Sequence, residues 1–176
     1  MKSAVTFSDK TVNDWALKNE VLNDLMVSSG VAVLTFNPAL EGAIGKGAFN
    51  VTGTGVIVGR KLMPVNGNVG IGGHINMRIP SGAATASVGV ICYDDDYNNL
   101  GTRYFIASGQ ALTTSSMDVA FYKGMMVAFT GMAGLMFPAG TRFVQPVLNI
   151  TANTAGVIFD SFVIENMTYA RAAQWS

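Results

Sequence analysis

The chain has 176 residues, of which 49% are hydrophobic and only 12% are charged, about half the share that globular domains usually carry. This composition excludes a disordered chain, because disorder requires low hydrophobicity and high charge. Eleven basic and eleven acidic residues balance, and no basic run is present, so the electrostatic footprint of a nucleic-acid-binding protein is missing. A neutral, apolar surface is poorly soluble by itself, which favours an oligomer that hides part of it.

No segment approaches the roughly 18 consecutive apolar residues of a membrane span, so we expect no membrane insertion. The first ten residues, MKSAVTFSDK, lack the apolar centre of a signal peptide. The single cysteine, Cys92, lies in the apolar run SVGVICY, where we expect a buried, unreactive thiol. One cysteine allows no intrachain disulfide, which excludes a small disulfide-stabilised secreted fold.

Residues 11–30, TVNDWALKNEVLNDLMVSSG, are charged and have the spacing of a helix. Apolar side chains and one asparagine recur at alternating intervals of three and four residues, as in the a/d seam of a coiled coil. The residues of this seam are Val12, Trp15, Asn19, Leu22 and Met26. Leu17, Val21 and Leu25 widen the apolar face, which suits three helices better than two. The pattern predicts a trimerising helix that ends at Gly30, and the alternative is an amphipathic helix packed on its own domain.

From residue 31 onward, short apolar or alternating runs separated by Gly, Pro, Asn and Asp predict an antiparallel β protein of about nine strands. The expected strands are 31–36, 55–63, 73–79, 86–93, 103–108, 118–122, 125–131, 143–151 and 156–166. Such spacing implies a β-sandwich, jelly roll or barrel. We therefore predict two parts, a helical stem over 1–30 and a β domain over 31–176. Within the β domain, Ile75, Met77 and Ile79 should face one way, and the doubly apolar run 86–93 should be a central strand.

Five segments, in this order along the chain, resemble the motifs of one family. They are LTFNPALEG (34–42), the stretch 57–82, VICYDDDYNNLG (90–101), MAGLMFPAGTRFVQPVLNIT (132–151) and AGVIFDSFVIEN (155–166). The chain thereby resembles the carbohydrate-binding-module-like jelly-roll domains of bacteriophage tail fibres and tailspikes.

The resemblance implies a mainly β, antiparallel jelly-roll sandwich preceded by a short N-terminal helix. It also implies a homotrimer in the virion that recognises a glycan on the host surface, without catalysis and without a cofactor. The tryptophan usual after the opening motif is absent, since AIGKGAFN follows Glu41 and Gly42. Two alternatives therefore stay open: a structural fibre spacer or tip domain that binds no sugar, and an accessory module of a carbohydrate-active enzyme.

The segment around 93–104 contains the best candidate sugar contacts. Tyrosine rings offer flat faces, while the arginine and the carboxylates can hydrogen-bond sugar hydroxyls. The candidate binding residues are Tyr93, Asp94, Asp96, Tyr97, Arg103 and Tyr104. The alternative for the tyrosines is a structural role in the core or at its rim.

A metal site in this segment is disfavoured. Asp94, Asp96 and Asn98 alternate as in a calcium loop, but Asn99 and Phe105 stand where that loop needs glycine and glutamate. The alternative is a solvated hairpin turn, since Asp and Asn are turn formers.

A second metal site is implied by the resemblance alone. In related modules a structural calcium joins the opening motif to the last strand, and the corresponding oxygens are those of Asn37, Glu41 and Asp160. A surface-facing Asp160 is the alternative, and we expect no metal. Few carboxylates remain outside the stem and the 94–96 cluster, so glycoside hydrolysis, which needs a facing pair, is not expected either.

We predict that Val12→Asp or Leu22→Asp yields a folded monomer, because a charge in the seam has no partner there. Light scattering on a sizing column should give a mass near three times 18.5 kDa for the unmodified chain and near 18.5 kDa for the variants. Binding to cells should weaken in the monomer through lost avidity. Equal binding by both forms would contradict the avidity argument.

Overall fold

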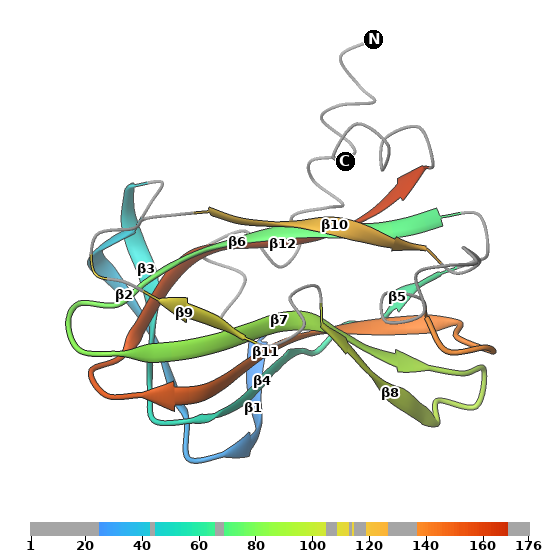
Figure 1. Cartoon of the computed structure of the whole chain (residues 1–176), viewed down its shortest axis with the longest axis horizontal. Coiled ribbons are helices and arrows are strands. Elements are labelled where there is room, and N and C mark those ends of the chain that lie inside the picture. The colour runs from blue at the N-terminus through green and yellow to red at the C-terminus, as the bar shows by residue number, and fades with distance from the viewer. Residues whose placement is uncertain are drawn as a thin grey trace, which may run out of the picture.

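The computed structural model of the chain describes residues 25–42, 45–65, 69–104, 109–112, 114, 119–126 and 137–168. Two antiparallel sheets, called sheet A and sheet B here, lie face to face (Figure 1). The described residues therefore form a mainly β, sandwich-like fold, as the sequence predicts.

Sheet A is the lower layer in Figure 1. Its strands, in spatial order, are β1 (Leu25–Gly30), β4 (Gly55–Gly59), β11 (Phe143–Asn153), β7 (Ala84–Tyr93) and β8 (Asn99–Tyr104). Two short strands complete it, β5 (Met63–Pro64) beside β11 and β9 (Gln110–Leu112) beside β7.

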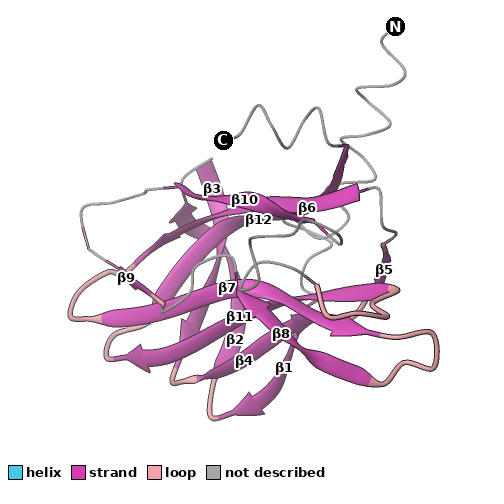
Figure 2. Ribbon diagram, turned by 45° about the vertical axis from the view of Figure 1, so that its right-hand side comes forward, coloured by secondary structure: helices cyan, strands magenta, loops and turns pink. Residues whose placement is uncertain are grey.

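Sheet B is the upper layer, and its order is β10 (Val119–Met126), β6 (Val69–Arg78), β12 (Val157–Thr168), β3 (Gly45–Thr52) and β2 (Val33–Gly42). Strands make up all of the regular structure that is described (Figure 2). No helix among these residues is long and apolar enough to span a membrane.

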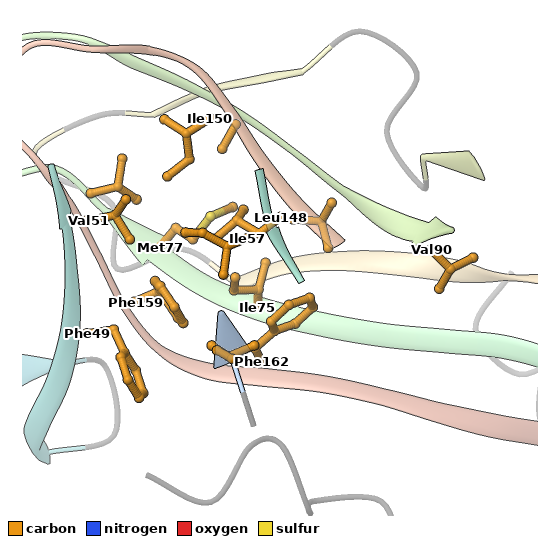
Figure 3. Packing of buried hydrophobic residues seen from close by; sticks show 14 of the residues in the cluster. Phe49, Val51, Ile57, Ile75, Met77, Val90, Leu148, Ile150, Phe159 and Phe162 are labelled. Carbon is orange, nitrogen blue, oxygen red and sulfur yellow. The ribbon is translucent and has the colours of Figure 1, made fainter. Parts of the chain in front are cut away.

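The core lies between the two sheets (Figure 3). Sheet B contributes Phe49 and Phe159, whose rings stack with centroids 5.1 Å apart. Sheet A contributes aliphatic side chains such as Val88 and Leu148, which lie directly opposite each other on neighbouring strands and are fully buried. Burial of such side chains is the main favourable term in folding, at roughly 25 cal/mol per Å² of apolar surface.

The predicted alternation in β6 is confirmed, since Ile75, Met77 and Ile79 are buried to 3% exposure or less. The expectation for 86–93 is also confirmed. β7 lies between β11 and β8, and its core-facing side chains are buried, while Thr85, Ile91 and Tyr93 on its other face are half-buried.

Asn153 links two turns at one end of the sandwich. Its Nδ2 donates to the carbonyls of Val51 and Gly53, both at 2.9 Å, and its Oδ1 accepts from the Gly156 N–H at 2.7 Å. Gly156 has φ +102°, and a Cβ there would lie 2.8 Å from Asn50 Oδ1, so this turn requires glycine.

Several strand predictions were wrong in extent. The run 55–63 contains β4 and the separate β5, β8 begins at Asn99 and not at residue 103, and the described parts of the runs 118–122 and 125–131 belong to one strand, β10. Residues 105–108 and 127–131 lie outside the described residues, so the predictions there stay predictions. Three strands were missed altogether, β1, β3 and β9. The glycines of GKGAFNVT conceal the alternation in β3, where Phe49 and Val51 face the core while Asn50 does not.

The C-terminal part of the predicted helix is also corrected, because Leu25–Gly30 is strand β1. Pairing with β4 buries Leu25 to 2% exposure, and this tertiary gain overrides a marginal helical preference in a segment rich in Val and Ser. Met26 thus leaves the predicted seam, and Leu25 leaves the wider apolar face of the predicted helix. Residues 11–24, with Val12, Trp15, Asn19 and Leu22, lie outside the described residues, so a helix there stays a prediction.

We predict that Phe159→Ala lowers the free energy of unfolding by about 3–5 kcal/mol, because it removes a ring stacked in the core. Urea denaturation followed by fluorescence measures the change. Thr35→Ala, at an exposed position of β2, is the control and should stay within about 0.5 kcal/mol of the unmodified chain. Equal stability of the two variants would contradict the packing described here.

Candidate functional site

One face of sheet A points away from sheet B, and we call it the outer face. Because side chains alternate along a strand, residues opposite each other on β7 and β11 share a face. Val88 and Leu148 face the core, so their neighbours in sequence face outward. The outer face of these two strands carries Ser87, Ile91, Tyr93, Phe143, Gln145, Val147 and Asn149.

Tyr104, at the end of β8, joins this face because it lies opposite Gly89. A Cβ at residue 89 would collide with the Arg103 carbonyl and lie 2.7 Å from Cα of Tyr104, so glycine allows β8 to approach β7 closely. The Tyr104 hydroxyl accepts a hydrogen bond from Asn149 Nδ2 at 3.3 Å. Asn149 belongs to β11, and β7 lies between β11 and β8. The hydrogen bond therefore reaches across β7 and orients the ring of Tyr104.

Tyr93 is held in a similar way. Its hydroxyl donates to Gln145 Oε1 at 2.8 Å, and Gln145 Nε2 donates to the Gly59 carbonyl at 2.6 Å. Burial, reinforced by the neighbouring Cys92, raises the pKa of Tyr93 above its ordinary value of 10.0. The phenol therefore stays protonated at neutral pH and remains a donor. Each tyrosine is thus half-buried and oriented by an amide side chain of β11.

Beneath these polar groups lies a small apolar floor. Val58 and Val147 are opposite each other on β4 and β11, and their side chains are 2% and 1% exposed without belonging to the core cluster. None of the outer-face side chains of β7 and β11 is charged. The face therefore combines oriented aromatic rings, amide groups and a neutral floor, a combination suited to an uncharged ligand with both apolar surfaces and hydroxyl groups.

The hairpin loop between β7 and β8 is closed by Asp94. Its Oδ1 accepts from the N–H groups of Asp96 at 3.0 Å and Asn98 at 2.8 Å, and its Oδ2 accepts from Asn98 Nδ2 at 3.0 Å. These bonds, led by the Asn98 side chain, lower the pKa of Asp94 below its ordinary value of 3.8. Both carboxylate oxygens of Asp94 are therefore already engaged inside the loop.

The tip of the same loop packs on the start of β11. The ring of Tyr97 stacks on that of Phe143, with centroids 5.1 Å apart, although Tyr97 is 61% exposed. Tyr97 has φ +62°, a conformation that costs a side-chain-bearing residue roughly 1–2 kcal/mol, and the ring stack offsets part of this. Arg142 Nε donates to Asp95 Oδ2 at 3.3 Å, an exposed ion pair of small energetic weight.

The structure brings three of the six predicted site residues together on the outer face. Tyr93 and Tyr104 lie there directly, and Tyr97 joins through Phe143, which lies opposite Tyr93. Arg103 lies opposite Val90 and therefore on the other face. Burial raises the pKa of the Cys92 thiol to about 11. The positive charge of Arg103 and a hydrogen bond with Thr141 oppose this rise only in part.

The remaining two predicted residues belong to the loop, where Asp94 closes the turn and Asp96 is exposed. Sequence reasoning missed Gln145 and Asn149. Their signal was present, since the polar residues of the otherwise apolar run FVQPVLNIT, Gln145, Asn149 and Thr151, all lie at even spacings and therefore on one side of the strand.

The calcium site implied by the resemblance does not fit the described residues. Asn37 Oδ1 accepts from its own loop at the Ala39 N–H, 2.9 Å away, and the Glu41 carbonyl accepts from Arg78 Nη2 at 2.7 Å. A guanidinium already occupies the position beside Glu41, and a second cation would be repelled. Nowhere in the described part of the chain do three or more His, Cys, Asp or Glu side chains gather to hold a metal.

Solved structures share this architecture. The xylan-binding domain CBM22-1 of Paenibacillus barcinonensis Xyn10C is 14% identical and has a TM-score of 0.55, with 82% of this chain and 86% of that chain covered. The C-terminal family 22 carbohydrate-binding module of Clostridium thermocellum Xyn10B is 10% identical, with a TM-score of 0.51 over 81% of this chain and 85% of that one.

A phage protein shares the fold as well. The enzymatically active domain of bacteriophage CBA120 tailspike protein 4 is 10% identical and has a TM-score of 0.57, with 89% of this chain but only 21% of that chain covered. No family model and no curated protein sequence matches the chain. At these identities the likeness defines the fold alone, which is that of a carbohydrate-binding-module-like β-sandwich.

We predict that the Asn98 amide resonance titrates with a midpoint below 3.8, because its N–H reports the charge on Asp94. The lowered pKa means that Asp94 stabilises the loop above the unfolded-state pKa near 3.9, and that this contribution is lost as pH falls through the folded-state pKa. An NMR pH titration measures the midpoint. Asp94→Asn is the control, and persistence of the same titration in that variant would contradict the assignment.

Proposed function

We propose that the chain is a receptor-binding domain of a phage tail fibre, which acts in the virion as a homotrimer and binds a glycan on the host surface. The binding surface is the outer face of sheet A, with Tyr93 and Tyr104 as the principal contacts. The ligand is an uncharged sugar chain, because the outer-face side chains of β7 and β11 carry no charge.

The observation that carries the proposal is the orientation of Tyr93 and Tyr104 by Gln145 and Asn149. A ring whose position is fixed before binding loses little conformational entropy when a sugar stacks on it. The hydroxyl and amide groups around each ring supply both donors and acceptors, which sugar hydroxyls require. Tyr104 lies opposite Gly89, which is four residues from Tyr93 along β7. The backbone positions of the two tyrosines are therefore roughly 13 Å apart along the strand direction, a spacing that suits an extended ligand.

Two further observations support the fibre part of the proposal. The tailspike structure shares the fold over 89% of this chain. Residues 11–24 retain a self-association pattern in the sequence. Three copies in parallel would multiply a weak affinity per site, because binding of the first copy raises the effective concentration of the others.

We infer that the domain binds its glycan without cleaving it. Both oxygens of Asp94 are engaged by the loop, and Asp95 pairs with Arg142, so neither is poised as one of the two facing carboxylates of a glycosidase.

A second candidate function is that of an accessory module in a carbohydrate-active enzyme. The xylan-binding domain of Xyn10C and the carbohydrate-binding module of Xyn10B, which share the fold, favour this interpretation. Both candidates use the same face, and they differ in the source of the glycan and in the number of copies.

We predict that Tyr104→Ala weakens glycan binding by about tenfold or more, since a stacked ring contributes about 1.4 kcal/mol or more. Tyr104→Phe keeps the ring, loses the contact with Asn149 and should weaken binding less. The measurement is an array of bacterial surface polysaccharides with xylan included, followed by titration calorimetry on each hit. Ser81→Ala, at an exposed turn position outside the outer face, is the matched control with unchanged affinity.

The outcomes separate the candidates. Preference for a bacterial polysaccharide supports the fibre, whereas preference for xylan supports the enzyme module. No binding to any glycan would contradict both and leave a structural spacer. Release of reducing ends from a bound polysaccharide would contradict the absence of catalysis.

A further inference from the structure

The exposed apolar side chains gather at one margin of the sandwich. Among the described residues, five large hydrophobic side chains are exposed, and four of them lie between residues 26 and 33. These four are Met26, Val27, Val31 and Val33, with exposed fractions of 41%, 36%, 75% and 58%. We call the segment from Leu25 to Phe36 the apolar margin. An isolated exposed valine needs no explanation, but four such side chains within eight residues, on two adjoining strands and the turn between them, indicate a contact surface.

The apolar margin also carries two unpaired strand edges. In the described part of the chain, β1 pairs with β4 alone and β2 pairs with β3 alone. Each strand therefore ends its sheet, β1 in sheet A and β2 in sheet B, and Val31 and Ala32 join the two (Figure 1). The outward backbone groups of such strands are available to another strand.

Charge distinguishes this margin from the opposite ends of both sheets. Residues 25–40 contain no charged side chain, and Pro38 is the first proline of the chain. The strands at the other ends each contain a cation, Arg103 in β8 and Lys123 in β10. Charged residues, proline and bulges on end strands prevent association between edges. In β2 these features lie in its second half, at Pro38, Glu41 and the bulge after Asn37, so the first half of the strand has no such protection.

We infer that the apolar margin is the contact surface between copies of this chain. A neutral, apolar surface meets its own copy without charge repulsion and gains from the burial of Val31 and Val33. The predicted self-associating segment, residues 11–24, directly precedes Leu25, the first residue of the apolar margin. Because packed helices lie about 8–10 Å apart, association of that segment would bring the margins of the copies together.

This inference rests on the self-association in the proposed function and is independent of glycan binding. It adds that the β domains touch each other through β1 and β2, instead of hanging separately from a stem. The backbone edges then gain partners in the assembly.

The experiment introduces charge into the margin of the full chain. In the double variant Val31→Lys, Val33→Lys, we expect self-association to weaken by about tenfold or more, because each contact would bury ammonium groups. Analytical ultracentrifugation over a dilution series measures the dissociation constant. The matched control is Ser81→Lys, Ala155→Lys, at two exposed turn positions, which should leave the dissociation constant unchanged. An unchanged constant in the first variant, or a monomeric unmodified chain, overturns the inference.

A second variant serves if the double lysine variant does not fold. Val31→Cys places a single accessible thiol at the margin, because Cys92 is fully buried and its pKa is raised to about 11. A short bis-maleimide should join copies of this variant and leave Ser81→Cys unjoined. Equal yields in both overturn the inference. Glycan titration of the unmodified chain separates glycan binding from association. Absence of glycan binding in a chain whose copies still associate through the margin contradicts the proposed function alone.

Discussion

The register between β7 and β11 determines both surfaces of sheet A. These two strands pair from Phe143 opposite Tyr93 to Asn153 opposite Ala84, with one bulge after Ile150. A slip of β11 by one residue would turn Val144 and Leu148 to solvent and bury Gln145 and Asn149 without partners. The same pairing that completes the core therefore presents the polar side chains outward. The packing of the core therefore also holds the candidate site in place.

The loop of the hairpin from β7 to β8 is fixed by local hydrogen bonds and by tertiary contacts together. Asp94 closes the loop through bonds to its own backbone and to Asn98, which the composition of the loop already indicates. The position of the loop is decided elsewhere, by the stack of Tyr97 on Phe143 and by the approach of β8 to Gly89. Asp94, a candidate ligand contact in the sequence, instead closes the loop that carries Tyr97.

The apolar margin and the outer face of sheet A differ in the side chains that they expose. The outer face combines polar groups and rings that are oriented but accessible, as a weak, reversible sugar contact requires. The margin combines apolar side chains with open strand edges, as a lasting contact between copies requires. Weak binding per copy and firm association of copies are complementary, because avidity depends on the second to amplify the first.

The sequence by itself determined the fold class and most strands, and it singled out three tyrosines that lie in or beside the candidate site. Strand alternation and turn residues are local signals, and they located β6, β7, β11 and β12 and the tyrosines at 93, 97 and 104. Tertiary structure alone decided that Leu25–Gly30 is a strand, because the gain lies in pairing with β4, and that Arg103 faces away from the tyrosines, because register assigns the faces. It also decided that Gln145 and Asn149 meet the two rings. These contacts join residues far apart in the chain, and no local pattern encodes which distant strand will lie alongside.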